Sequence, residues 1–92
     1  MSESSVDEVL SAFADRERIP LRELGERLGM DRAARSRAVK AGVIRPAGRE
    51  GLGGGYVIDQ AEARRLIFAA LKAAAAGIAI VTMLRALDAA SK

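Results

Sequence analysis

The chain contains no cysteine and no histidine, and only 3% of its 92 residues are aromatic. Without cysteine, neither a disulfide framework nor a thiolate metal site can form. Without histidine, the chain also lacks imidazole catalysis and the commonest metal ligand in proteins. The core must then be built from leucine, isoleucine, valine and many alanines, a composition that favours closely packed helices over a β-sandwich. We expect no metal and no cofactor.

The remaining residues do not form a pattern typical of catalysis. A nucleophilic site would have to depend on serine or lysine, which need a neighbouring base or a lowered pKa. Acidic residues occur in two helix-start patterns, Ser5–Glu8 and Asp59–Glu62, and no isolated pair of carboxylates is placed for acid–base chemistry. We therefore expect that the protein is not an enzyme.

Features of secreted and membrane proteins are also missing. The first residues, Met1–Ser5, carry neither a basic nor an apolar signal segment. Leu66–Leu84 has a single charge, Lys72, in 19 residues, but it is rich in alanine and is divided by Gly77. This segment predicts two helices of a globular core rather than a membrane span. We expect a cytoplasmic protein of one domain, residues 1–92, with no membrane partner.

Positive charge is concentrated in the middle of the chain. Residues 27–49 contain seven basic residues and one acidic residue, Asp31, a net charge of +6. The whole chain has a net charge of +3, so the remaining residues are net negative. A polyanion such as DNA is the partner that a cluster of this kind favours.

Apolar spacing and capping residues predict a series of short helices. An N-terminal helix is expected at 5–16, opened by the capping box Ser5–Glu8. A helix-turn-helix is expected at 21–42. Its first helix carries three leucines and contains Gly25, where the missing side chain would let a crossing helix approach closely; the alternative is that glycine is merely tolerated there. Its second helix, 31–41, is expected to have Asp31 as its N-cap.

A β-hairpin and two further helices are predicted for the second half. Val43–Ile44 and Tyr56–Ile58 are β-prone runs on either side of the glycine-rich segment 51–55, which predicts a two-stranded wing at 43–58. Two C-terminal helices are expected within 59–90, the first opened by Asp59. The fold class is therefore mostly α: a winged helix-turn-helix with a short two-stranded wing, an extra N-terminal helix and two C-terminal helices.

In their order, these segments resemble the MerR superfamily of DNA-binding domains, including its small BldC-like and excisionase-like members. The resemblance covers about residues 19–88. It rests on the segments Leu24–Met30, Ser36–Arg37, Lys40–Ile44, Leu52–Gly54 and Gln60–Leu66, and on Ala76–Ile78 leading into Met83–Leu87.

The resemblance implies a recognition helix in the major groove of DNA and a wing, residues 45–56, on the backbone or the minor groove. By position, Arg37 would be a recognition-helix contact. Arg35 stands where the family usually buries an aliphatic side chain, so its stem would have to lie along the preceding helix or the helix would have to be rotated. The segment after the paired glycines lacks the arginine of smaller members. The long coiled coil and effector domain of full-length members are missing, so no small-molecule effector is expected.

Eight residues are the candidate DNA contacts. On the predicted recognition helix and wing these are Arg32, Arg35, Ser36, Arg37, Lys40, Arg45, Arg49 and Tyr56. For Arg45 and Arg49, pairing with Glu50 or solvation is the alternative to phosphate contact, and Tyr56 could bond a phosphate or pack the wing.

The apolar stripe of the last helix is wider than one small core requires. Val81 and Leu84 are the candidates for self-association, as a homodimer or a cooperative oligomer on DNA. The alternative is that this helix packs against the N-terminal helix at 5–16.

Two functions follow from these observations. The first is sequence-specific binding of double-stranded DNA by a small transcriptional regulator or an excisionase-like architectural factor. The alternative is a protein-interaction module, a regulatory adaptor or anti-activator, that uses the apolar C-terminal helices on a degenerate winged-helix scaffold.

Overall fold

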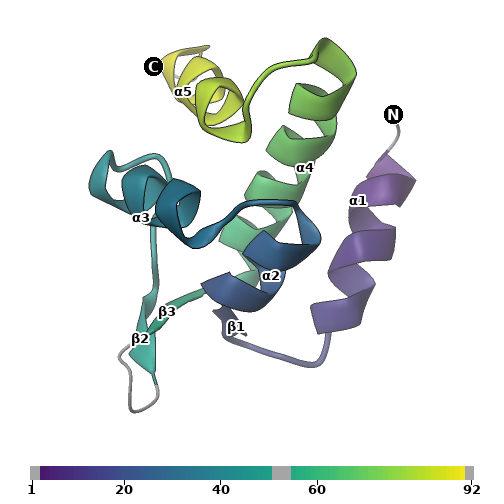
Figure 1. Cartoon of the computed structure of the whole chain (residues 1–92). Helices are drawn as coiled ribbons and strands as arrows, with labels where there is room; N and C mark the ends of the chain where they lie inside the picture. Colours follow the sequence, from purple (N-terminus) through teal and green to yellow (C-terminus); the bar gives the residue numbers. More distant parts are fainter. Residues whose placement is uncertain (1–2, 51–54, 91–92) are drawn as a thin grey trace.

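Five α-helices and a small antiparallel sheet make up the part of the chain that the computed structural model describes, residues 3–50 and 55–90 (Figure 1). Its radius of gyration is 12.5 Å, the value of a compact chain of this length. The helices are α1 (Glu3–Leu10), α2 (Leu21–Arg27), α3 (Arg32–Lys40), α4 (Gln60–Ala76) and α5 (Ile80–Ala90). The strands are β1 (Ile19–Pro20), β2 (Gly48–Glu50) and β3 (Gly55–Ile58).

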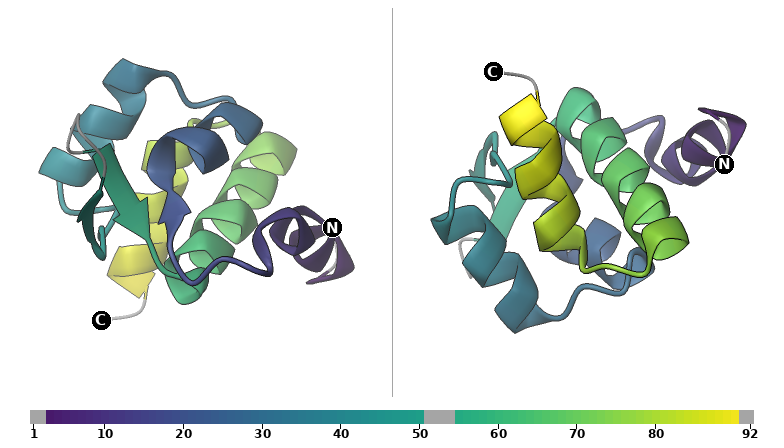
Figure 2. Two further views of the ribbon diagram at one scale, coloured as in Figure 1. Left: turned by 90° about the horizontal axis from the view of Figure 1, so that it is seen from below. Right: turned by 90° about the horizontal axis from the view of Figure 1, so that it is seen from above.

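The long helix α4 is the centre of the fold. Helices α1 and α5 both pack on α4 and lie on opposite sides of it, as the right-hand view of Figure 2 shows. Buried leucine and isoleucine from α4, Leu66 and Ile67, join Leu24 of α2 and Leu84 of α5 in one core. Small residues of α4, such as Ala69, are also fully buried and allow its neighbours to approach closely.

The sheet has three strands where two were predicted. Its order is β1-β3-β2, with antiparallel pairing throughout. The additional strand, β1, pairs Ile19 with Ile58, and Pro20 fits there because an edge strand tolerates a residue without an N–H group. The segment 51–54, predicted as the tip of the hairpin, lies outside the described residues.

The prediction of a strand at Val43–Ile44 is wrong. Both side chains are buried, and both backbone N–H groups donate to the carbonyl of Ala38 near the end of α3. The pair therefore closes α3 and anchors its exit to the core, and the strand β2 begins only at Gly48. A short apolar run has the same sequence pattern whether it forms a strand or closes a helix, because either structure can bury two consecutive side chains.

Capping residues fix three of the helix ends. The side chain of Asp31 accepts from the N–H of Ala34 at 2.7 Å, and that of Asp59 from the N–H of Glu62 at 2.8 Å, so both predicted N-caps are confirmed. Gly77 ends α4 with a φ of 70°, a conformation that favours glycine.

The predicted N-terminal helix is only partly correct. Helix α1 begins at Glu3, so Ser5 lies inside the helix and is not its N-cap. The helix also ends earlier than residue 16, because a short 3₁₀ turn, Ser11–Phe13, follows Leu10 and brings Phe13 into the core.

The predicted division of the apolar segment at Gly77 is confirmed. Helices α4 and α5 are bent by 112° at their junction. In the described residues no single helix is long and apolar enough to cross a membrane, and this helix pair meets the criteria of length and composition only when the two are taken together.

Candidate nucleic-acid interface

Helix α3 presents one exposed face to solvent. Its side chains are exposed in the described structure, and at helical spacing they fall on one side: Arg32, Ala33, Ser36, Arg37 and Lys40. None of the three basic side chains among them forms an ion pair with another described residue. The opposite side of the helix carries Ala38, which is fully buried. Helix α3 thus holds three solvated cations around two small residues.

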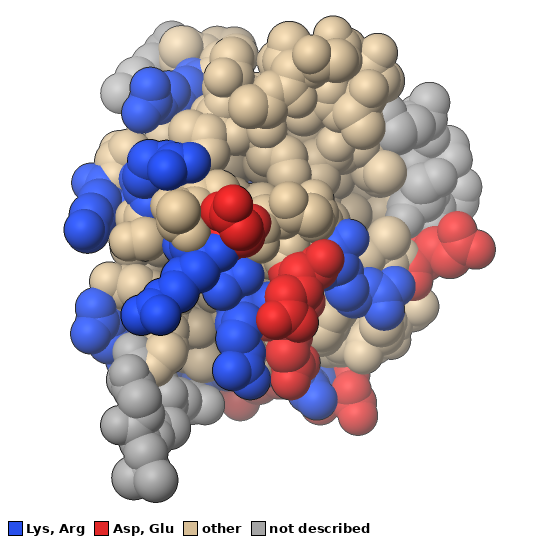
Figure 3. Space-filling model, in the orientation of Figure 1, with Lys and Arg blue, Asp and Glu red and all other residues tan. Residues whose placement is uncertain are grey.

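Basic side chains continue from α3 onto the sheet. Figure 3 shows many lysine and arginine side chains on the side of the molecule formed by α3 and the β2–β3 hairpin. In the same view, most acidic side chains lie toward α2 and α1. The concentration of charge along the chain therefore becomes a concentration on one surface, where it attracts a polyanion most strongly.

Arg35 does not belong to this exposed face. Its stem crosses α2 at Gly25, where an added Cβ would lie 2.5 Å from the Arg35 Cδ atom. Its Nη1 atom donates to the carbonyl oxygen of Met30 at 3.0 Å. Of the two arrangements left open by the sequence, the structure has the stem lying along the preceding helix. Arg35 therefore packs between α2 and α3, and its contact with DNA stays a prediction.

Replacing Gly25 with alanine is expected to destabilise the protein by about 1–2 kcal/mol, the usual cost of overpacking. The new methyl group would displace the Arg35 stem, since the three atoms nearest to it all belong to that side chain. In an Arg35→Ala background the same replacement should be neutral or stabilising, because alanine is the better helix former by about 0.8–1 kcal/mol. Urea unfolding of the four proteins measures this coupling, and equal costs of Gly25→Ala in both backgrounds would contradict it.

On the hairpin, Arg49 and Tyr56 form a pair. They are direct partners across β2 and β3. The Arg49 guanidinium lies 4.4 Å from the centre of the Tyr56 ring and donates a hydrogen bond to the tyrosine hydroxyl. Tyr56 thus packs within the wing and holds the exposed arginine in place, and its bond to a phosphate stays a prediction.

Arg45 lies between α3 and β2 and pairs with α5. Its Nη2 atom is 3.0 Å from the Oδ1 atom of Asp88. The side chain of Arg45 is nevertheless 64% exposed. The alternative pairing with Glu50 concerns a side chain outside the described part of the structure.

A buried ionic pair that the sequence analysis did not identify lies beneath Arg45. Glu62, only 8% exposed, is the one buried charged residue of the described chain. Its Oε1 atom accepts from Nε of Arg65 at 2.8 Å, and its Oε2 atom accepts from Nη2 of Arg65 at 2.6 Å. Oε2 also accepts from the backbone N–H of Arg45 at 2.8 Å. Arg65 in turn donates to the carbonyl of Val43.

This pair clamps the segment that joins α3 to the hairpin, because it binds that segment through the carbonyl of Val43 and the N–H of Arg45. The hydrogen bond with Glu62 raises the pKa of Arg65 above its ordinary value, although burial opposes the rise, and the nearby carboxylate of Asp88 adds to it. The guanidinium therefore stays charged at any ordinary pH. In the sequence, Glu62 was hidden because it also completes the capping pattern that begins at Asp59.

Of the two predicted self-association residues, only Val81 is partly exposed, and self-association itself stays a prediction. Leu84 is fully buried in the core of the single chain, and Val81 is partly buried against the same core. Their stripe is wide because α5 packs on α4, which also differs from the expected packing against the N-terminal helix. The exposed large apolar side chains in the described structure are Phe68 and Ile78, at 40% and 41%.

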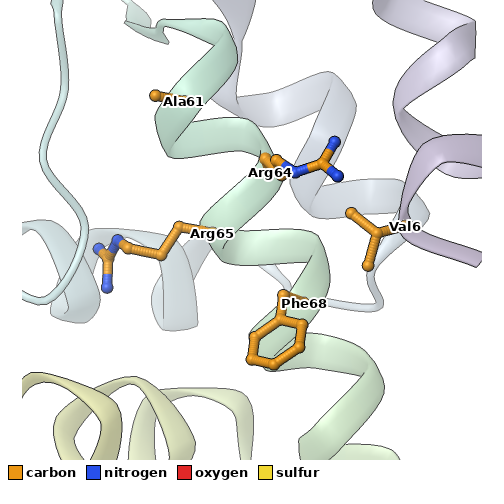
Figure 4. A pocket seen from close by; sticks show the side chains of 5 residues that line it. All are labelled: Val6, Ala61, Arg64, Arg65 and Phe68. Carbon is orange, nitrogen blue, oxygen red and sulfur yellow. The ribbon is translucent and has the colours of Figure 1, made fainter. Parts of the chain in front are cut away.

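A hollow of about 270 Å³ lies between α1 and α4, and Val6, Ala61, Arg64, Arg65 and Phe68 line it (Figure 4). In Figure 4, Arg64 points toward α1 and Arg65 points away from it. Arg64 is already paired with Asp7, at 2.7 Å. Among the described residues, no group of three or more metal-ligating side chains is placed to hold an ion.

Comparison with models of known protein families, with curated proteins and with solved structures gives no match to this chain.

Proposed function

We propose that the chain is a small winged helix-turn-helix protein that binds double-stranded DNA sequence-specifically, as a transcriptional regulator or an excisionase-like architectural factor. One observation supports this proposal above the others. The exposed face of α3 combines three cations that form no ion pair with another described residue, Arg32, Arg37 and Lys40, with small residues between them. A helix in the major groove gains from each of these cations, through phosphate neutralisation or through contact with a base.

The neighbouring elements fit the same interpretation. Helices α2 and α3 are joined by four residues, 28–31, and the turn contains Gly29 with a φ of 77°. A short turn with glycine is typical of helix-turn-helix motifs. The β2–β3 hairpin follows α3 after seven residues, 41–47, in the position of a wing.

In the proposed complex α3 lies in the major groove. Ala33 and Ser36 allow the helix to approach the base edges, and Arg37 is the proposed base contact, since arginine commonly binds guanine through two hydrogen bonds. Four basic residues neutralise phosphates and fix the orientation on the duplex: Arg32, Lys40, Arg45 and Arg49. The Tyr56 ring keeps the Arg49 guanidinium in place for that contact.

A salt titration tests the proposal. If about four to five phosphates are neutralised per protomer, log K for a duplex should fall against log salt with a slope near −4. Removing Lys40 should make the slope shallower by about 0.9. The matched control is Lys72→Ala, which removes an exposed lysine from α4, stacked on Phe68 and away from the proposed interface. A flat salt response of the parent protein would contradict DNA binding.

A second candidate function is a protein-interaction module, and one observation favours it. From Ala73 to Leu84 the chain has no charged residue, and Ile78 is exposed at the α4–α5 turn. In Figure 3 the upper end of the molecule accordingly carries a broad uncharged area. Interfaces between proteins are depleted of charge at their centre. A module of this kind needs no polyanion, so the same salt titration separates the two candidates.

A further inference from the structure

We infer that Asp88 competes with DNA phosphate for Arg45 and so lowers the affinity of the chain for any duplex. This inference rests on the proposed DNA-binding function. It concerns a residue of α5, an element outside the proposed recognition helix and wing. The residue acts on DNA through Arg45 and not by contact with the bases.

The geometry fixes both partners of this ion pair. The backbone of Arg45 is held by Glu62, whose Oε2 atom accepts its N–H at 2.8 Å. Asp88 is held on α5, is only 24% exposed and lies 3.9 Å from Nη1 of Arg65. The Arg45 guanidinium, 3.0 Å from Asp88, belongs to a side chain that is 64% exposed. The anion is thus anchored, while the cation is in contact with solvent.

The position of Arg45 in the chain places it between two elements that would contact the same duplex. It follows α3 and precedes β2, and the Glu62–Arg65 pair holds this connection against α4. A duplex that contacts Lys40 on one side and Arg49 on the other would pass close to Arg45. Its phosphates would then compete directly with the carboxylate of Asp88.

The energetics allow this exchange. An ion pair with one exposed partner is worth little in water, because solvent and salt screen it. A phosphate of the duplex offers Arg45 a comparable contact and in addition releases condensed counterions. Asp88 therefore cannot prevent phosphate binding, but each binding event must first break its pair with Arg45. Removing the carboxylate should raise affinity.

The test is Asp88→Asn, titrated against a short duplex of random sequence. We expect binding to tighten about two- to fivefold at moderate salt, and the slope of log K against log salt to stay close to that of the parent, because both proteins neutralise the same phosphates. Asp88→Glu keeps the charge and should stay close to the parent. Asp7→Asn, which removes a carboxylate paired with Arg64 between α1 and α4, should change affinity less than about twofold.

A double-mutant cycle with Arg45→Ala separates competition from simple repulsion. If Asp88 acts through Arg45, the change in log K that Asp88→Asn causes should be less than about half as large in the Arg45→Ala background as in the parent. An equal gain in both backgrounds would show general repulsion and overturn the inference. Circular dichroism checks the fold of each variant, and Asp88→Ser replaces Asp88→Asn if the latter does not fold.

The two proposals fail in different ways. If the parent protein does not bind the duplex, or binds it without salt dependence, the proposed function is wrong. If the parent binds with the expected slope and Asp88→Asn binds equally well, only the role of Asp88 is wrong.

Discussion

Replacing Glu62 with alanine is expected to destabilise the protein by about 3 kcal/mol, which is a large share of the stability of a small domain. The carboxylate is buried and accepts three hydrogen bonds, two from Arg65 and one from the N–H of Arg45. Without it, Arg65 would keep a partly buried guanidinium whose Nη1 atom already has no hydrogen-bond partner in the described structure. Removing one member of such a pair costs more than the pair itself contributes, because the other charge remains desolvated.

Two further variants identify the cause of the loss. Glu62→Gln retains an acceptor for the Arg45 N–H and should cost less, about 1–2 kcal/mol. The combined variant Glu62→Leu with Arg65→Met replaces the pair by apolar side chains of similar size and should recover most of the stability lost in Glu62→Ala. Urea unfolding monitored by circular dichroism measures all three. A cost below about 1 kcal/mol for Glu62→Ala would show that the pair does not support the fold.

Loss of the Glu62–Arg65 pair should also affect the proposed DNA interface. The Glu62–Arg65 pair binds the chain at Val43 and Arg45, between α3 and the hairpin. Both elements would contact the same duplex, so their relative position decides whether they can do so together. The Glu62–Arg65 pair fixes the position of α3 relative to the hairpin. Glu62→Gln should therefore weaken DNA binding more than its effect on stability alone suggests.

Local chemistry made much of the fold predictable. The helix starts at Asp31 and Asp59 and the stop at Gly77 depend on residues next to the helix ends, and all three are confirmed. At Gly25 the missing side chain makes room for the Arg35 side chain, where the close approach of a crossing helix was expected.

Long-range contacts could not be predicted in this way. Strand β1 exists only because Ile19 pairs with Ile58, which lies far away in the sequence. Val43 and Ile44 have the side chains of a strand but close a helix. The sequence also cannot show that Arg45 meets Asp88, since that contact requires α5 to pack beside the α3–β2 connection. The ion pair of Arg45 could therefore be identified only in the structure.

The final prediction concerns Arg37. Arg37→Ala is expected to weaken binding to a preferred sequence by about 1–3 kcal/mol and to relax the preference at one base pair. The side chain is exposed on the face of α3 and forms no ion pair with a described residue, so its loss should not affect folding. Arg49→Ala should instead weaken all sequences alike, because that arginine is held on the hairpin and is proposed to contact phosphate.

The measurement begins with selection of duplexes from a random pool by the parent protein. The selected sequence and a scrambled one are then titrated with both variants and with Lys72→Ala, the control on α4. A base contact must change the ratio of the two affinities, because a phosphate contact is present on either sequence. If Arg37→Ala and Arg49→Ala leave that ratio equally unchanged, Arg37 is a phosphate contact. Sequence would then have to be read elsewhere on α3, where Arg32 and Lys40 are the remaining exposed cations.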